Sequence, residues 1–141
     1  MSRPTRSAFT LIEVLIVVVI LGILAAIAYA GFTGATDDAK QNCAYSSLQT
    51  IRRHIGVYQA RNSQQLPNVT EGDGTWGQVI GDNYLYSAPV NTWVGGDNAK
   101  VIVFGTGPDT AYQTDHGWIY DPATGMVYAG SFDAQDHPIP R

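Results

Sequence analysis

The sequence is poor in cysteine and in charge. Its single cysteine, Cys43, excludes an internal disulfide, and we expect it to pack as a small side chain on a helix. Only 14% of the residues are charged and the net charge is −4, so the chain lacks the basic surface of a nucleic-acid-binding protein. The three histidines, His54, His116 and His137, form no catalytic spacing with serine, cysteine or aspartate. The sequence therefore predicts that the chain is not an enzyme.

A long stretch without charge stands near the N-terminus. No residue from Val14 to Ala30 carries a charge, and a helix of this length would measure about 26 Å, close to the hydrocarbon thickness of a bilayer. Arg3 and Arg6 precede the stretch, and such basic residues keep an N-terminus in the cytoplasm and direct the following chain outward. Glu13 borders the stretch, and a carboxylate inside a bilayer is costly enough to require a partner.

Cleavage of the chain between Ala8 and Phe9 would create such a partner. The new ammonium of Phe9 would lie four residues before Glu13. Glu13 would then lie one turn into the helix, where the positive end of the helix dipole favours an anion. In a packed array, Glu13 could also neutralise the Phe9 amine of a neighbouring copy. This arrangement requires that the leader is removed and that the subunits stack.

A resemblance is carried by the stretch R-S-A-F-T-L-I-E-V-L-I-V-V-V-I-L-G-I-L-A-A-I-A. It is similar to the N-terminal signature of type IV pilins and type II secretion pseudopilins. The resemblance implies that a prepilin peptidase cleaves after Ala8 and methylates Phe9, and that Glu13 serves filament assembly. It further implies a homo-oligomeric helical filament built by inner-membrane assembly machinery, without nucleic acid as a pseudopilin's partner. Two positions depart from the family pattern, because Ala8 replaces the usual glycine and Ala30 replaces a frequent proline.

Two simpler interpretations compete for the same segment. A secretory signal peptide would be cleaved after Ala28-Tyr29-Ala30, which fits an A-x-A site behind a basic region. The mature chain would then begin at Gly31. A plain membrane anchor would explain the length of the apolar run but not the placement of Glu13 after Phe-Thr-Leu-Ile. The N-terminal mass of the mature protein separates these alternatives.

Beyond the apolar run, the helical pattern continues with one apolar stripe. Its members recur at spacings of four, three, four and three, and they are Ala44, Leu48, Ile51, Ile55 and Tyr58. This period indicates an amphipathic helix. The sequence therefore predicts one nearly continuous helix from about Phe9 to about Asn62, with a transmembrane first half and an amphipathic second half.

The strand signals come late in the chain. Residues 99–105, 116–121 and 125–130 are rich in β-branched and aromatic residues, and residues 122–124 form a compact hairpin loop. They predict an antiparallel sheet of about three strands, laid on the amphipathic half of the helix in an α+β, pilin-like fold. Trp76 to Leu85 are expected to form a short helix or turn. The tail from Asp133 to Arg141 is expected to be poorly ordered.

These signals divide the chain into three parts. Residues 1–8 form a prepilin leader, residues 9–36 a hydrophobic transmembrane and assembly helix, and residues 37–141 an extracytoplasmic pilin-like domain. The last part holds eleven acidic and six basic residues, a formal charge of −5. It therefore presents an acidic domain outside the membrane.

Aspartates gather in the C-terminal loops, namely Asp109, Asp115, Asp121, Asp133 and Asp136. Carboxylate oxygens of this kind suit Ca²⁺, although no EF-hand spacing is present and aspartates of solvated turns give the same pattern. The resemblance to major pseudopilins implies a calcium ion in these loops, with Asp109 and Asp115 as its ligands. No other cofactor is expected.

Together these observations predict a structural subunit of a type IV pilus-like filament, most simply a type II secretion pseudopilin. It would be a single-pass inner-membrane protein with its C-terminal domain outside the cytoplasm. Two alternatives remain open. One is a type IV pilin for adhesion, motility or DNA uptake, and the other is a membrane-anchored or secreted binding domain.

Overall fold

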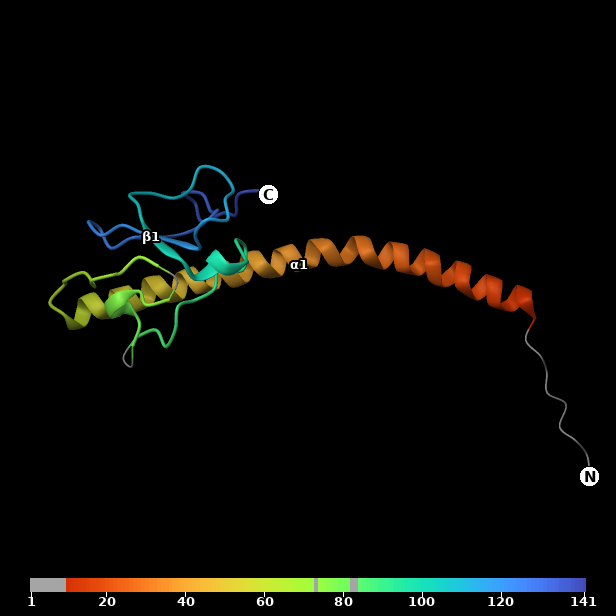
Figure 1. Cartoon of the computed structure of the whole chain (residues 1–141), viewed down its shortest axis with the longest axis horizontal. Helices are drawn as coiled ribbons and strands as arrows, with labels where there is room; N and C mark the ends of the chain where they lie inside the picture. Colours follow the sequence, from red (N-terminus) through yellow and green to blue (C-terminus); the bar gives the residue numbers. More distant parts are fainter. Residues whose placement is uncertain (1–9, 73, 82–83) are drawn as a thin grey trace, which may run out of the picture. The chain divides into compact units, whose positions relative to one another are not determined.

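The computed structural model describes residues 10–72, 74–81 and 84–141, and of residues 30–33 it describes the backbone alone. Contacts divide the chain into two compact units, Met1–Thr36 and Asp37–Arg141. One helix, α1, covers Leu11–Arg61 and therefore runs through both units (Figure 1). The predicted long helix is confirmed over the described residues, and Phe9 lies outside them.

In the first unit, α1 is apolar on every side. Every large apolar side chain described between Leu11 and Ile27 is more than half exposed, and Leu11 reaches 86%. By length and composition this helix is able to cross a membrane. So much apolar surface is unfavourable in water, and the unit therefore requires lipid or other protein to cover it.

In the second unit, α1 buries one face. Ala44, Leu48 and Ile51 are fully buried and Ile55 is 4% exposed, which confirms four members of the predicted stripe, while the fifth, Tyr58, is half-buried. These side chains join a core whose largest fully buried members from the rest of the unit are Trp76, Trp118, Tyr120 and Phe132. Cys43 lies on the same helix but is exposed, so its expected packing role was wrong.

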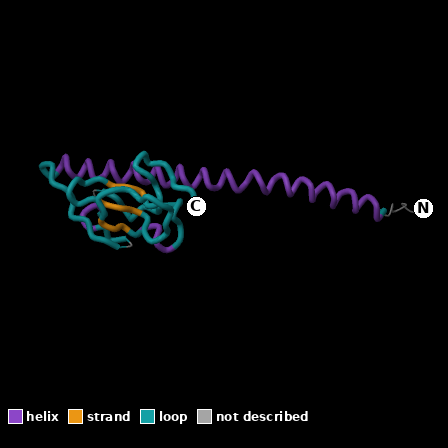
Figure 2. The backbone as a smooth tube through the Cα atoms, turned by 90° about the horizontal axis from the view of Figure 1, so that it is seen from above, coloured by secondary structure: helices purple, strands orange, loops and turns teal. Residues whose placement is uncertain are grey.

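The sheet has three short strands in the order β1-β2-β3: Ile102–Phe104, Trp118–Tyr120 and Val127–Ala129 (Figure 2). Strands β2 and β3 are antiparallel, and the hairpin loop between them is confirmed. Strand β1 runs parallel to β2, so the sheet is mixed and the predicted antiparallel pairing of the first two strands was wrong. The physical reason is the long segment between Phe104 and Trp118, because it returns the chain to the starting edge of the sheet as a parallel pair requires.

Two short 3₁₀ helices accompany the sheet, η1 at Gly77–Val79 and η2 at Asp97–Lys100. The first confirms the short helix expected near Trp76, and both Trp76 and Val79 are buried beside it. The second replaces the beginning of the strand expected from residue 99. The loops are tied to one another by indole groups, because Trp76 donates to the carbonyl oxygen of Lys100 over 3.0 Å and Trp118 donates to that of Pro89 over 2.9 Å.

The C-terminal tail, Asp133–Arg141, is attached to the rest of the unit, so the expectation of a poorly ordered end was wrong. The indole N–H of Trp93 donates to the carbonyl oxygen of Ile139 over 3.1 Å, and the amide of Ile139 donates to the carbonyl oxygen of Ser131 over 2.8 Å. The guanidinium of Arg141 lies 4.4 Å from the centre of the Trp93 ring. These partners are far apart in sequence, and local composition therefore gave no sign of them.

Candidate functional site

The start of α1 is closed by a reciprocal pair of hydrogen bonds between Thr10 and Glu13. The amide of Glu13 donates to Thr10 Oγ1 over 3.3 Å, while the amide of Thr10 donates to Glu13 Oε2 over 2.9 Å. The Thr10 hydroxyl also donates to Glu13 Oε2, over 2.8 Å. This is a capping box, which satisfies two backbone amides that a helix start otherwise leaves unpaired. It holds the Glu13 carboxylate at the positive end of the helix.

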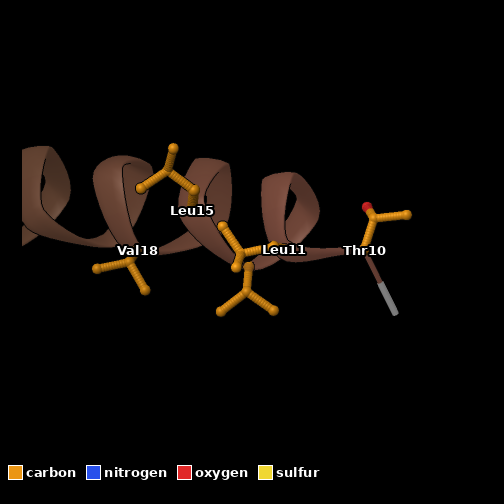
Figure 3. A pocket seen from close by; sticks show the side chains of 5 residues that line it. Thr10, Leu11, Leu15 and Val18 are labelled. Atoms are coloured by element: carbon orange, nitrogen blue, oxygen red, sulfur yellow. The ribbon is translucent and has the colours of Figure 1, made fainter. Parts of the chain in front are cut away.

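The carboxylate stands among apolar side chains of α1, and α1 is the only element of the first unit among the described residues. A shallow hollow on α1 is lined by Thr10, Leu11, Val14, Leu15 and Val18, and Glu13 is not part of its lining. Figure 3 shows Thr10, Leu11, Leu15 and Val18 at the start of the helix. Since residues 10–18 alone line it, the hollow is an open part of the helix surface. Glu13 Oε1 accepts no hydrogen bond from any residue that the structure describes. One carboxylate oxygen is therefore available to an external donor.

Glu13 was predicted from the sequence as a site residue, whereas its partner Thr10 was not. The signal was present, because Thr-x-x-Glu before an apolar run is the pattern of a capping box. Ala8 and Phe9, the predicted cleavage and methylation residues, lie outside the described residues. The assignments of cleavage and methylation therefore stay predictions.

The loops of the second unit bring Asp109 to Gln113, His116 and Ser131. Asp109 Oδ2 accepts hydrogen bonds of 2.7 Å from Gln113 Nε2 and of 2.7 Å from the amide of Ser131. The Nε2 atom of His116 lies 3.4 Å from Oδ1. Burial of Asp109 opposes its ionisation, but the nearby His116 ring and the hydrogen bonds from Ser131 and Gln113 outweigh this effect and lower the pKa of Asp109.

The structure does not join Asp109 and Asp115 in a calcium cage. The oxygens of Asp109 face N–H groups, whereas Ca²⁺ requires about six to eight oxygen ligands. Asp115 is exposed, and its amide donates to Gln113 Oε1. Within residues 10–72, 74–81 and 84–141, no three His, Cys, Asp or Glu side chains are placed to hold one metal ion. In this arrangement Asp109 and Asp115 do not form a calcium site, and their assignment as calcium ligands stays an untested prediction.

The other aspartates of these loops stabilise turns or pair with arginine. Asp121 accepts from the Thr124 hydroxyl over 2.7 Å and from the Ala123 amide over 2.9 Å, and these bonds lower the pKa of Asp121. Asp136 forms an ion pair with Arg52 of α1. The acidic cluster of the sequence is therefore divided among separate local interactions.

Asn91 is a second residue that the sequence analysis did not single out. It is fully buried. Its side-chain nitrogen donates to the carbonyl oxygens of Gly117 over 2.8 Å and Gly130 over 3.0 Å. Its side-chain oxygen accepts from the amides of Trp93 over 3.0 Å and Val94 over 3.2 Å. The residue joins three loops that are distant in sequence, and no local pattern reveals that.

Comparisons with known proteins agree with this arrangement. Residues 3–29 match the family described as the prokaryotic N-terminal methylation motif. The type II secretion system core protein G of Pseudomonas aeruginosa is 33% identical over 126 residues, which cover 80% of this chain and 85% of that protein. The corresponding protein of Dickeya chrysanthemi is 28% identical over 132 residues, with coverage of 82% and 85%. No solved structure matches the chain.

A pilus protein is also similar. The type IV narrow pilus major component of Thermus thermophilus is 31% identical over 102 residues, which cover 72% of this chain and 81% of that protein. Since the first unit ends at Thr36, similarities that cover 72% and 80% of the chain necessarily include much of the second unit. The chain belongs to the family of type IV pilins and type II secretion pseudopilins.

Proposed function

We propose that this chain is a structural subunit of a type II secretion pseudopilus, which acts by polymerising and turns over no substrate. The observation that carries the proposal is the Glu13 carboxylate. It is held by Thr10 at the first turn of an apolar helix, and its Oε1 atom accepts no hydrogen bond from the described residues. Family membership supports the same conclusion, because the similar proteins named above include core subunits of that secretion system.

In the proposed mechanism, the chain inserts into the inner membrane and its second unit lies outside the cytoplasm. The prepilin peptidase cuts after Ala8 and methylates Phe9. The assembly machinery then moves the subunit from lipid into a bundle of N-terminal helices. There Glu13 Oε1 accepts a hydrogen bond from the Phe9 ammonium of a neighbouring copy. Little water reaches this bundle, so the attraction between the two charges is stronger than it would be in water.

Apolar surface gives the bundle its cohesion, while the charge pair sets its register. The exposed valine, leucine and isoleucine side chains of residues 11–27 can pack against other helices as readily as against lipid. Such packing alone allows neighbouring helices to slide. A buried acid that must meet a cation penalises every register in which the two groups are apart.

The proposal is tested by Glu13→Ala in the native host. We expect the variant to stay in the membrane after alkaline washing, because its apolar run is intact, and to yield no filaments. Asp97→Ala is the matched control, because Asp97 is exposed on η2, and it should assemble normally. Normal filaments from Glu13→Ala would overturn the proposed pairing.

Mass spectrometry of the mature protein tests the processing steps. We expect a chain that begins at Phe9 and carries one added methyl group. A chain that begins at Gly31 would show that the segment is a signal peptide, and a chain that keeps residues 1–8 would show that no prepilin peptidase acts on it.

A second candidate function is that of a type IV pilin, which the similarity to the Thermus thermophilus pilus component favours. Deletion of the chain's gene separates the two functions. Loss of protein secretion with normal surface motility indicates a pseudopilin, and loss of motility or DNA uptake with normal secretion indicates a pilin.

A further inference from the structure

In the second unit, α1 turns one face away from the core. Figure 2 shows most of the loops and the three strands gathered along the opposite side of this part of the helix. We call this the outer face of α1, and its members are Asp38, Ala39, Asn42, Ser46, Arg53 and Ala60, all of them exposed. At 100° per residue they lie within about 60° of one direction, opposite to Leu48 and Ile51.

Two residues of the outer face are ionised, Asp38 near its start and Arg53 near its end. Neither forms an ion pair or a side-chain hydrogen bond within the part of the chain that the structure describes. The charged residues that directly precede them in sequence do form ion pairs. Asp37 Oδ1 lies 3.6 Å from Lys40 Nζ and 3.6 Å from Arg141 Nη1, and Arg52 forms an ion pair with Asp136. The adjacent charges are therefore used inside the unit, whereas Asp38 and Arg53 are not.

The two charges cannot meet within one chain. They are separated by 15 residues of the same helix, which corresponds to about 22 Å along the axis. Between them the outer face has only uncharged side chains, including Ala39, Asn42 and Ser46. The face therefore has an acid at one end, a base at the other and a neutral surface between them, and it is complementary to a second copy of itself.

We propose that Asp38 of one copy pairs with Arg53 of another copy, in parallel α1 helices displaced by about 22 Å along their axes. This contact joins copies other than those that share a Glu13–Phe9 pair, which are displaced by only about 6 Å. This inference rests on the proposed filament function. Parallel alignment follows from that function, because the apolar segments of all copies insert into one membrane with the same orientation. In such an array every copy still offers Asp38 to one neighbour and Arg53 to another. The contact is head-to-tail, so it leads to an open filament rather than a closed dimer.

Charge reversal tests the pairing in the full-length protein in its native host. One exposed ion pair changes an association constant by up to about fivefold, and a like-charge contact acts in the opposite direction. We expect Asp38→Arg and Arg53→Asp each to lower the yield of sheared filaments by about fivefold, because each removes the attraction and introduces a like-charge contact. The double variant should restore the yield, because it exchanges the partners and recreates the pair.

The matched controls are Asp97→Arg and Lys100→Asp on η2, which make the same changes of charge on exposed residues outside the outer face. They should assemble normally. Normal filaments from both single variants of the outer face would overturn the inference. Failure of the double variant to recover, while all variants remain folded in the membrane, would overturn it as well.

Cross-linking distinguishes the parallel array from an antiparallel pair. The variant Asp38→Cys/Arg53→Cys is built on Cys43→Ser, which removes the native thiol. Oxidation of assembled filaments should give a ladder of multimers, because each copy links to two different neighbours. Dimers alone, or no cross-link in filaments that form normally, would overturn the staggered arrangement.

These outcomes are separate from a failure of the proposed function. If the unaltered chain forms no filament in its host, the pseudopilin proposal itself fails. If it forms filaments that do not respond to reversal of Asp38 and Arg53, only the pairing proposed here fails.

Discussion

Arg52 of α1 and Asp136 of the C-terminal tail form a paired contact across 84 residues of sequence. Arg52 Nη2 donates to Asp136 Oδ1 over 2.9 Å, and Nη1 donates to Oδ2. Arg52 Nε also donates to the carbonyl oxygen of Val127 in β3, over 3.0 Å. One guanidinium therefore joins the helix, the outer edge of the sheet and the tail. The single cysteine, Cys43, allows no internal disulfide. The Arg52–Asp136 and Trp93–Arg141 contacts therefore attach the C-terminal region to the rest of the second unit.

Arg52→Ala should lower the free energy of unfolding by about 2 kcal/mol, because it leaves the half-buried Asp136 carboxylate and the Val127 carbonyl oxygen without their donor. The measurement is thermal unfolding of the full chain in detergent. Arg53→Ala is the control, because Arg53 is exposed and unpaired among the described residues, and it should change stability by less than about 0.5 kcal/mol. Equal effects of the two variants would contradict this role of Arg52.

Asn91→Asp should be more damaging, with a loss of about 3 kcal/mol or more, although the two side chains have the same shape. The new carboxylate would face the carbonyl oxygens of Gly117 and Gly130, which now accept hydrogen bonds from Asn91. Asn98→Asp is the control, because its bond to the Thr114 carbonyl oxygen is exposed. Chemical denaturation measures the free energy of unfolding of the two variants. If Asn91→Asp lowers it no more than Asn98→Asp does, the hydrogen bonds of Asn91 do not hold the three loops together.

The stability of the second unit should decrease in acid. The pKa values of Asp109 and Asp121 are lowered in the folded chain, whereas an unfolded aspartate titrates near pH 3.9, its approximate reference value. The unfolded state then binds more protons as the pH falls. The stabilisation is therefore fully present above about pH 4 and is lost as the pH falls through the lower folded values.

Unfolding temperatures recorded between neutral pH and pH 3 test this expectation. The curve of the unaltered chain should be flat at neutral pH and fall below about pH 4. Asp109→Asn should weaken the fall, because one of the shifted groups is gone. Asp97→Asn changes an exposed position, and its unfolding temperature should depend on pH in the same way as that of the unaltered chain. An unfolding temperature that stays constant down to pH 3 would rule the effect out.

Thr10→Val should loosen the first turn of α1, because valine has the shape of threonine but cannot accept from the Glu13 amide. Loss of a cap costs about 1 kcal/mol, so the amide hydrogen of Glu13, which donates to Thr10 Oγ1, should exchange about fivefold faster in detergent micelles. Thr10→Ser keeps the hydroxyl and should exchange like the unaltered chain. Equal exchange in all three proteins would show that the cap does not stabilise this turn.

Local sequence patterns were sufficient where the interactions are local. The apolar run, the stripe from Ala44 to Ile55 and the hairpin loop at 122–124 depend on neighbouring residues, and the structure confirms each of them. The capping box of Thr10 and Glu13 is equally local and was readable in the sequence. Cleavage after Ala8 and methylation of Phe9 depend on an external enzyme, so they stay predictions.

The features that depend on residues far apart in the sequence could not be predicted from local sequence patterns. The parallel pairing of β1 and β2 depends on the course of the whole segment between them, and short β-branched runs do not encode its direction. The attachment of the tail depends on Arg52, which occupies a helix position that reads as solvated. The environment of Asp109 depends on Ser131, 22 residues away, and a count of aspartates could not show that N–H groups surround it.

The sequence by itself determined three features: an apolar helix long enough for a membrane, an acid at the start of that helix, and an amphipathic continuation. Each of them depends only on the types and spacing of residues that are close in the sequence. Only the tertiary structure decided which charges are used inside the second unit and which remain on its surface. Ion pairs form between side chains that the fold brings within a few ångströms, and that proximity is set by the packing of the whole core.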